Sequence, residues 1–254
     1  MTPSVQAAPH TETSVDKALQ LLDVFTADDR CIGVAELARR AGLPKSTAFR
    51  LLTVLESNRL VARHGRQYTL GHHLFELGQR VPHCRPGGLR DTAAPFMEHL
   101  FQVSQETVHL AVLDGTDAMY IGKIRGRGRA LCPSSIGSRA PAACTGVGKA
   151  MLAFSDPALI RQVIGEGLRR RTPFTIVAPR LLGNELGRIR AEGVAYDNEE
   201  AKVGVVCVAA PIFDASKNVI ASVSITGTPG RFSPQRFAHE VERAALGITR
   251  AQAA

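Results

Sequence analysis

Three short amphipathic segments followed by two strand-like runs fill residues 13–70, and this order limits the fold of the chain most. Apolar residues follow helical spacing over residues 14–25 and again over residues 34–41, where Gly42 ends the segment. A third helical segment starts at Pro44, a favoured first-turn residue. The first half of the chain therefore begins as a three-helix unit with a tight turn between its second and third helices.

A β-hairpin is predicted directly after the third helix. Two β-prone runs, residues 60–63 and 66–70, flank the pair His64-Gly65, which has the composition of a two-residue turn. Three helices followed by a hairpin is the element order of a winged helix-turn-helix. The sequence thus predicts such a domain over residues 13–70, preceded by a disordered tail over residues 1–12.

Seven residues of this predicted domain are candidates for contact with double-stranded operator DNA. The second helix of a helix-turn-helix places its N-terminal part in the major groove, so Arg50 is expected to pair with a guanine edge or a phosphate. Hydroxyls and main-chain amides at the helix start suit phosphate oxygens, and two arginines flank the hairpin. The candidates are Lys45, Ser46, Thr47, Arg50, Thr53, Arg63 and Arg66.

The distribution of charge supports this interpretation. The chain carries a net charge of +8, and seven basic residues between Arg39 and Arg66 are opposed in that stretch only by Glu56. A solvated basic face on a small helical bundle is the alternative explanation. The turn, the hydroxyl-rich helix start and the basic hairpin occur in the order that DNA binding requires, which favours DNA binding over that alternative.

The remainder of the chain predicts a linker and a second domain. Residues 71–81 have helical spacing and are stopped by Pro82, so we expect a linker helix within residues 71–85. Residues 86–254 alternate between helical and strand periodicity. Strands and helices mixed in this way indicate an α+β domain with a largely antiparallel sheet.

At this point the sequence resembles the IclR family of bacterial transcriptional regulators. The resemblance rests on Ser14-Val-Asp-Lys-Ala-Leu-Gln-Leu-Leu22, Gly42-Leu-Pro-Lys-Ser-Thr-Ala-Phe-Arg-Leu-Leu52, Tyr68-Thr-Leu-Gly71, Gly148-Lys-Ala-Met-Leu-Ala153 and Ser222-Val-Ser-Ile-Thr-Gly227. It implies a winged helix, a linker helix and a GAF-like effector-binding domain. It also implies a homodimer, or a tetramer built from dimers, on operator DNA.

The resemblance further implies a pocket for a small organic acid effector. The family positions match Gly146, Val147, Gly148, Asp197, Cys207, Ser224 and Thr226. Thr226 stands where Ser is common and Val147 where Ala is frequent, so the identity of the effector is not carried over. The alternative is that Cys207 is a small buried apolar residue and that both hydroxyls bond to neighbouring backbone.

Other signals are weaker. Gly148-Lys149 resembles a phosphate-binding loop, but the residues at positions 143 and 150 are both Ala. The histidines and cysteine at positions 72, 73, 83 and 84 lack zinc-ligand spacing, and Cys207 has no histidine near it in sequence to act as a base. We therefore expect no metal, no cofactor and no enzymatic activity.

The expected function is a cytoplasmic, effector-controlled transcription regulator, with a repressor favoured over an activator. No apolar run approaches the length of a membrane span, and no secretion signal precedes residue 14. Two alternatives remain open: a small-molecule enzyme with a DNA-binding appendage, and a nucleoid-type protein without an effector.

Overall fold

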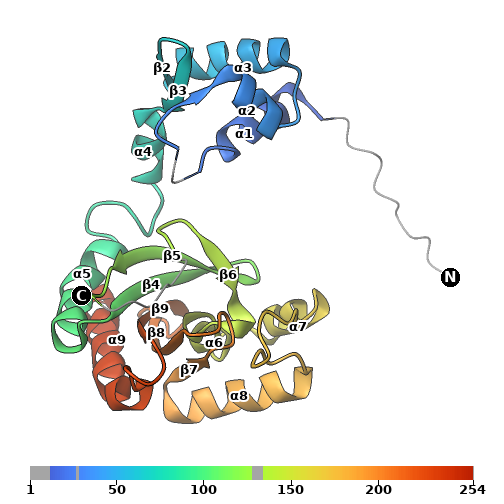
Figure 1. The fold of residues 1–254 in the computed structure, drawn as a ribbon. Coiled ribbons are helices and arrows are strands. Elements are labelled where there is room, and N and C mark those ends of the chain that lie inside the picture. Colours follow the sequence, from blue (N-terminus) through green and yellow to red (C-terminus); the bar gives the residue numbers. More distant parts are fainter. Residues whose placement is uncertain (1–11, 27–28, 128–133, 254) are drawn as a thin grey trace. The chain divides into compact units, whose positions relative to one another are not determined.

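The structure is a computed structural model that describes residues 12–26, 29–127 and 134–253. Contacts between residues divide the chain into two compact units, Met1–Val81 and Pro82–Ala254, which are described separately (Figure 1). The disordered tail predicted over residues 1–12 lies outside the described residues except for Glu12. No helix in the described part of the chain combines the length and apolar character needed to cross a lipid bilayer.

The first unit is a winged helix-turn-helix, as the sequence predicts. Its elements are α1 (Ser14–Asp23), β1 (Ile32–Gly33), α2 (Val34–Arg40), α3 (Lys45–Ser57), β2 (Val61–His64), β3 (Gln67–Leu70) and α4 (His72–Gly78). The strands form a three-stranded antiparallel sheet in the order β1-β3-β2. A buried cluster that includes Leu21, Leu37, Leu52 and Tyr68 holds the helices against this sheet. The two-residue strand β1 is too short to be recognised by periodicity.

Local hydrogen bonds set the helix ends. Thr13 caps α1 in a capping box with Asp16: each side chain accepts a hydrogen bond from the other residue's backbone amide. The α2 helix ends in a Schellman motif. Gly42 adopts a φ of +65°, and the Leu43 amide donates to the Ala38 carbonyl at 2.9 Å. Glycine tolerates this left-handed conformation, so the turn that orients α3 depends on Gly42.

Two boundaries differ from the prediction. The hairpin turns at Gly65 and Arg66, one residue later than the expected pair, because His64 pairs with Gln67 and Gly65 takes the positive φ. The helical segment of the expected 71–85 linker is also shorter, since α4 ends at Gly78. Val81 donates to the Gly78 carbonyl in a tighter turn, and the following proline disfavours helical geometry at Val81.

The second unit is an α+β domain built on one antiparallel sheet. Its elements are α5 (Leu89–Ser104), β4 (Thr107–Asp114), β5 (Asp117–Ile124), β6 (Arg139–Pro141), the 3-10 helix η1 (Ala142–Cys144), α6 (Gly146–Leu152), α7 (Pro157–Gly165), α8 (Pro179–Glu192), β7 (Ala195–Asn198), β8 (Val206–Phe213), β9 (Val219–Gly227), the 3-10 helix η2 (Pro234–Phe237) and α9 (Ala238–Ala253). The six strands follow the order β6-β5-β4-β9-β8-β7. This architecture agrees with the predicted GAF-like domain.

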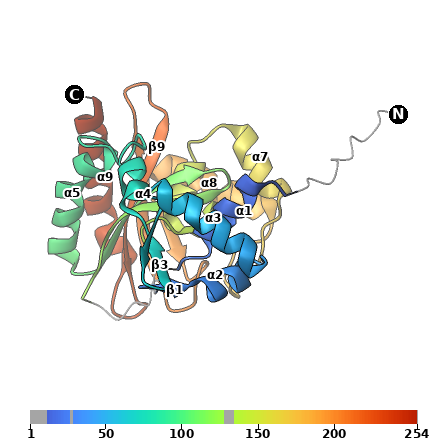
Figure 2. The ribbon, with the colours of Figure 1, turned by 90° about the horizontal axis from the view of Figure 1, so that it is seen from above.

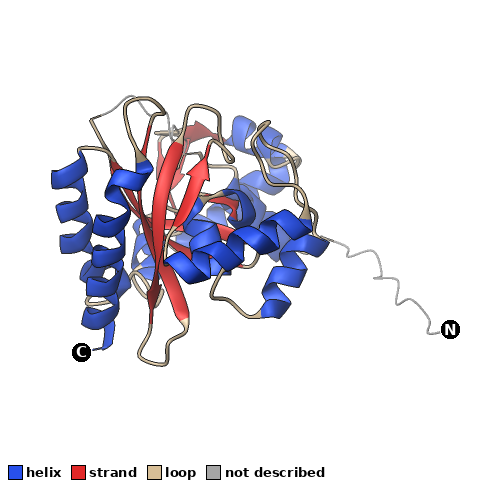
Figure 3. Cartoon of the chain, turned by 90° about the horizontal axis from the view of Figure 1, so that it is seen from below, coloured by secondary structure: helices blue, strands red, loops and turns tan. Residues whose placement is uncertain are grey.

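Helices cover both faces of this sheet. The α5 and α9 helices lie side by side on one face, and α6 packs against the other with α8 beyond it (Figures 1 and 2). Figure 3 shows the strands running between the two helical layers. Each layer has its own apolar core, one containing Leu110, Val208 and Val223, the other Val147 and Leu186. The sheet is therefore buried on both sides.

Substitution of Gly247 in α9 tests how closely this helix packs against α5. A Cβ at position 247 would lie 2.3 Å from Cε1 of the Phe96 ring, so Gly247→Ala is expected to lower the free energy of unfolding by about 1–3 kcal/mol. The matched control is Gly183→Ala in α8, where a Cβ meets no atom within 4 Å. There the helix propensity of alanine should stabilise the chain by about 0.5–1 kcal/mol. Urea unfolding measures both changes, and an equal effect of the two would contradict the close packing.

Candidate functional site

The start of α3 has backbone N–H groups that no side-chain cap accepts within the described residues. The N-cap is Pro44, which has no side chain to accept a hydrogen bond from the first turn, and the structure shows no side-chain cap there. Lys45 and Ser46 are exposed, and Thr47 is half-buried. A helix start with unfilled backbone N–H groups and a lysine carries partial positive charge and suits a phosphate oxygen.

Arg50 and Thr53 lie farther along α3 and differ in availability. Both are exposed, and Arg50 forms no ion pair within the described residues. The Thr53 hydroxyl donates to the Phe49 carbonyl at 3.0 Å, so that donor is directed at its own helix. The buried residues Ala48, Leu51, Leu52 and Leu55 fix the opposite face of α3 in the core. Arg50 is therefore the exposed residue on this helix best suited to reading a base edge.

The two wing arginines have different environments. The Arg63 guanidinium donates to the Gly65 carbonyl at 2.9 Å and lies about 6 Å from the rings of Phe49 and Tyr68. It ties the wing to α3 through cation–π contacts. Arg66 is exposed at the turn itself and forms no ion pair in the described part of the chain.

Acidic residues from outside the basic stretch neutralise part of it. Arg40 pairs with Asp29 at 2.6 Å and with Glu36 at 2.8 Å, and Arg39 also pairs with Glu36. Hydrogen bonds from Arg40 and Arg39 hold the pKa of the Asp29 and Glu36 carboxyls down at about 2. The cationic surface is consequently narrower than the count of basic residues implies, and it centres on Lys45, Arg50 and Arg66.

The second unit contains a cavity of about 250 Å³ between α6 and the sheet. Of the seven residues predicted to bind an effector, six line it: Gly146, Val147, Asp197, Cys207, Ser224 and Thr226. Other residues complete the wall, among them His109, Tyr120, Ser134, Ser138, Arg139, Thr145, Arg171 and Lys202. The sequence-predicted residues, which are up to 80 positions apart, thus share one cavity.

Strand register brings these side chains together. Asp197 pairs with Cys207, Cys207 pairs with Thr226, and Ser224 pairs with His109, so neighbouring strands contribute to the same patch of sheet. Side chains alternate between the two faces of a strand. The apolar alternates Val208, Val223 and Ile225 belong to the core beneath α5 and α9. The polar and small residues therefore face α6.

The start of α6 forms the roof of the cavity. A Cβ on Gly146 would lie 2.4 Å from the Cys207 sulfur, so glycine allows the helix to approach β8 this closely. The backbone N–H groups of Gly146 and Val147 have no acceptor among the described residues, whereas the Gly148 amide donates to the Thr145 side chain at 3.1 Å. A Cβ on Gly148 would also collide with the Ala142 backbone at 2.3 Å. Gly148 therefore packs against Ala142 and does not line the cavity, and its contact with an effector stays a prediction.

Cationic and aromatic residues of the cavity were not found from the sequence. Arg139 pairs with Asp114 at 2.5 Å, while the Arg171 guanidinium has no ion-pair partner in the described residues. Arg171 belongs to a run of three arginines in a loop, and nothing in that run marks which one lines the cavity. His109, a polar residue within an apolar strand, was the one detectable signal.

A buried charge cluster lies behind Asp197. Lys149 on α6 is 1 % exposed and pairs with Glu200 at 2.5 Å and with Glu185 at 3.5 Å. The Glu200 backbone amide donates to Oδ1 of Asp197 at 2.7 Å. Burial, and next the charge of Glu200, raises the pKa of Asp197 to about 7; burial also raises the pKa of Glu200. Asp197 can therefore present a neutral carboxyl to the cavity near neutral pH.

His109 is neutral in this environment. Burial, and next the charge of Lys123, lowers its pKa to about 3. Its Nε2 lies 2.7 Å from the Ser134 hydroxyl, and its Nδ1 lies 3.3 Å from the Thr226 hydroxyl. The geometry suits a hydrogen-bonding wall of the cavity. In the described residues, no three His, Cys, Asp or Glu side chains gather as metal ligands would.

Comparison with known proteins gives one consistent result. The family model for the IclR helix-turn-helix domain matches residues 14–65, and the model for the bacterial transcriptional regulator IclR C-terminal domain matches residues 86–250. The transcriptional repressor IclR of Escherichia coli strain K12 is 33% identical over 257 aligned positions, covering 97% of this chain and 93% of that protein. The regulator KdgR of the same strain is 35% identical, with coverages of 90% and 87%.

Solved structures have the same architecture. The IclR protein of Thermotoga maritima is 31% identical with a TM-score of 0.80, covering 95% of this chain and 99% of that one. An IclR homologue of Microbacterium hydrocarbonoxydans, solved with 4-hydroxybenzoate, has a TM-score of 0.87 at 24% identity, with coverages of 94% and 99%.

The raised pKa of Asp197 predicts a pH dependence of stability. Between its ordinary pKa of 3.8 and about 7, folded Asp197 holds a proton that the unfolded chain releases. The free energy of unfolding should therefore fall as pH rises through this window, by at most about 1.4 kcal/mol per pH unit from this group, and level off above it. Asp197→Asn should remove this component, because asparagine does not titrate. Its side-chain oxygen can still accept the hydrogen bond from the Glu200 amide. Urea unfolding across pH 4 to 8 tests it; a constant difference between the two chains would contradict it.

Proposed function

Because the chain belongs to the IclR family of bacterial transcriptional regulators, we propose that it represses transcription by binding an operator through α3 and the wing. A small organic acid bound in the cavity of the second unit changes the affinity for that operator. The observation that carries the proposal is the pairing of an uncapped, cationic start of α3 with a separate polar cavity. The first is a surface for phosphates and the second a site for one small molecule.

DNA contact is assigned to specific groups in the first unit. Lys45 and the amides at the start of α3 hold a phosphate, Arg50 reads a base edge in the major groove, and Arg66 at the wing tip contacts the backbone or the minor groove. Ser46, Thr47 and Thr53 add contacts of their own only where their hydroxyls reach the duplex. Arg63 is reassigned to holding the wing against Phe49 and Tyr68.

A homodimer is proposed for operator binding. One winged helix reads too few base pairs for useful specificity, and two related half-sites multiply it. The first unit also exposes large apolar side chains, with Val15 and Leu19 on α1 and Phe75 on α4 more than half exposed. Burial of these residues against a second copy would remove them from water. Sedimentation should give a dimer at micromolar concentration; a monomer that protects a palindromic operator would contradict this.

The effector is proposed to be a small acid that also carries a hydroxyl or keto group. The carboxylate would lie among the Gly146 and Val147 amides, the Ser224 hydroxyl and Arg171. Asp197 would repel an acid if ionised, but a neutral carboxyl near pH 7 accepts or donates a hydrogen bond to a hydroxyl of the ligand. The Microbacterium homologue was solved with 4-hydroxybenzoate, which has both groups. Residues 71–85 join the two units and are the proposed route of coupling.

The alternative of a small-molecule enzyme is disfavoured by the chemistry of the cavity. The Ser134–His109 contact resembles a nucleophile with its base, but a histidine whose pKa is about 3 is a weak proton acceptor at neutral pH. Burial raises the pKa of the neighbouring Cys144 thiol to about 12, which disfavours the thiolate needed for attack. We therefore assign the cavity to binding without turnover.

The DNA-binding surface is tested with two arginine variants. Arg50→Ala should weaken binding to the specific operator by about 1–3 kcal/mol and relax the preference at one base pair. Arg66→Ala should weaken binding to all DNA sequences similarly. It should also reduce the slope of log affinity against log salt concentration by about 1. The control is Arg161→Ala, an exposed arginine of α7 in the second unit. Fluorescence anisotropy measures all three, and unchanged operator affinity in the Arg50 and Arg66 double variant would refute the assignment.

The effector cavity is tested by calorimetry with 4-hydroxybenzoate and with small hydroxy and keto acids. Ser224→Ala should lower the affinity for whichever acid binds by about tenfold, since one hydrogen bond to a charged group is lost. Ser222→Ala is the matched control, because its hydroxyl already donates to the Ala210 carbonyl at 2.9 Å and does not line the cavity. The acid should be recovered unchanged and should alter operator affinity by about 1–3 kcal/mol. No binding at millimolar concentration, or equal binding to Ser224→Ala, would show the site to be misplaced.

A further inference from the structure

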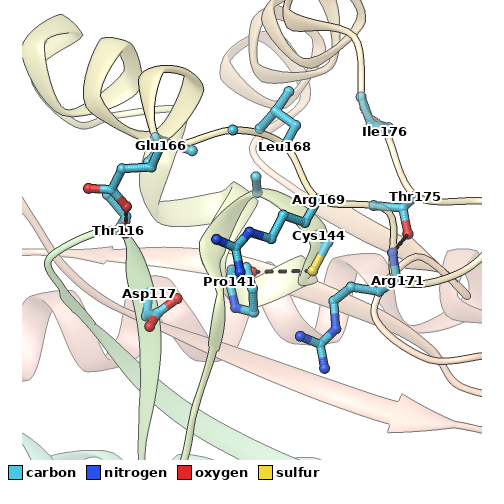
Figure 4. Close-up of a pocket in the computed structure, with 13 residues that line it drawn as sticks. Thr116, Asp117, Pro141, Cys144, Glu166, Leu168, Arg169, Arg171, Thr175 and Ile176 are labelled. Atoms are coloured by element: carbon cyan, nitrogen blue, oxygen red, sulfur yellow. Dashed lines mark hydrogen bonds between the residues drawn. The ribbon is translucent and has the colours of Figure 1, made fainter.

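A second cavity of about 460 Å³ lies in the same unit, outside the effector cavity (Figure 4). It is bounded by the β4–β5 turn, by β6 and η1, by the end of α7 and by the loop that follows α7. Its apolar lining comes from Pro141, Ala143, Cys144, Leu168 and Ile176. A concave site of this volume with an apolar floor and a few charged groups has the properties of a small-molecule site.

The two cavities share a boundary. Cys144 lines the second cavity, whereas the next two residues, Thr145 and Gly146, line the first. Arg171 lines both. The junction of η1 and α6 therefore separates the cavities, and one guanidinium is available to a ligand in either.

The charged residues of the second cavity extend from an acidic side, past Arg169, to Arg171. Figure 4 shows Asp117 and Glu166 on the side of Thr116, with Arg171 on the far side and Arg169 between them. Neither arginine, nor Asp117, forms an ion pair in the described part of the chain. The Glu166 carboxylate accepts hydrogen bonds from Thr116 at 2.6 Å and from Gln162 at 2.9 Å, which leaves its charge uncompensated.

We infer that this second cavity binds a zwitterionic small molecule, with a carboxylate on Arg169 and Arg171, an ammonium group beside Asp117 and Glu166, and an apolar body over the floor between Pro141 and Cys144. A ligand with only an acid would meet two carboxylates, and one with only an amine would meet two guanidinium groups. A molecule with both charges separated by a short apolar chain satisfies both sides. This site is separate from the effector site proposed above.

Competition for Arg171 follows from the shared boundary. A guanidinium can hold two carboxylates where both reach it in one position, as Asp29 and Glu36 reach Arg40. Because Arg171 lines two separate cavities, we expect a carboxylate in one cavity to draw its guanidinium away from the other. Each ligand should therefore weaken the other, and by linkage the two effects must be equal in size. A ligand in the second cavity would thus oppose binding of the effector within the same unit.

The probe is 6-aminohexanoate, with hexanoate and hexylamine as single-charge controls, measured by calorimetry on the full chain. We expect 6-aminohexanoate to bind more tightly than either control, and Arg169→Ala and Asp117→Asn each to weaken it by about fivefold. The matched control is Arg170→Ala: this neighbour does not line the cavity, and its guanidinium donates to the Pro173 carbonyl at 3.1 Å. Arg170→Ala and Ser224→Ala should leave 6-aminohexanoate binding unchanged.

The second site, the competition for Arg171 and the proposed function are each overturned by a different result. Equal affinity for 6-aminohexanoate and hexanoate, no binding at millimolar concentration, or equal loss in Arg169→Ala and Arg170→Ala would refute the second site. Loss of 6-aminohexanoate binding in Ser224→Ala would place the probe in the effector cavity instead. If the effector acid binds and 6-aminohexanoate leaves its affinity unchanged, competition for Arg171 is refuted. Failure of every acid in the effector panel with retained 6-aminohexanoate binding would refute the proposed function alone.

Discussion

The period of two along β4, β8 and β9 is the constraint on which the second unit depends. It directs Leu110, Val208 and Val223 into the core beneath α5 and α9, and it turns the intervening side chains toward α6. The apolar core holds the strands in register, because a slip by one residue would exchange the two faces. The same packing that stabilises the sheet therefore positions the polar groups of the effector cavity.

The approach of α6 to this sheet gives the cavity its roof. Two glycines permit it: Gly146 lies against the Cys207 sulfur and Gly148 against the backbone of Ala142. Lys149 on the same helix is buried beside Glu200 and Glu185. A buried ion pair is costly to desolvate and is strongly destabilising when one partner is removed. This cluster ties α6 to the loop that follows β7, and its Glu200 adds to the effect of burial in raising the pKa of Asp197.

Electrostatics in the DNA-binding unit depend on which charges are already paired. Asp29 and Glu36 neutralise Arg40 and part of Arg39, and aromatic rings hold Arg63. The Arg40 contacts join α2 to the segment that follows α1, and the Arg63 contact with Phe49 joins the wing to α3. Among the basic residues described between Arg39 and Arg66, Lys45, Arg50 and Arg66 have neither an acidic nor an aromatic partner. The surface that we propose for phosphate contact is therefore smaller than the whole basic stretch.

The order of the elements and the two-unit architecture followed from local patterns in the sequence. Helical spacing, Gly42 and the Gly65 turn are properties of neighbouring residues, and motif resemblance located six residues of the cavity. Contacts between distant segments were decided only by tertiary packing. Arg171 reaches two cavities from an arginine-rich loop, Gly148 packs on Ala142, and Asp29 pairs with Arg40 across 11 positions. The turn register and the end of α4 were also set by pairing and by the geometry before a proline. Local periodicity encodes which face a residue occupies; it does not encode which partner that face will meet.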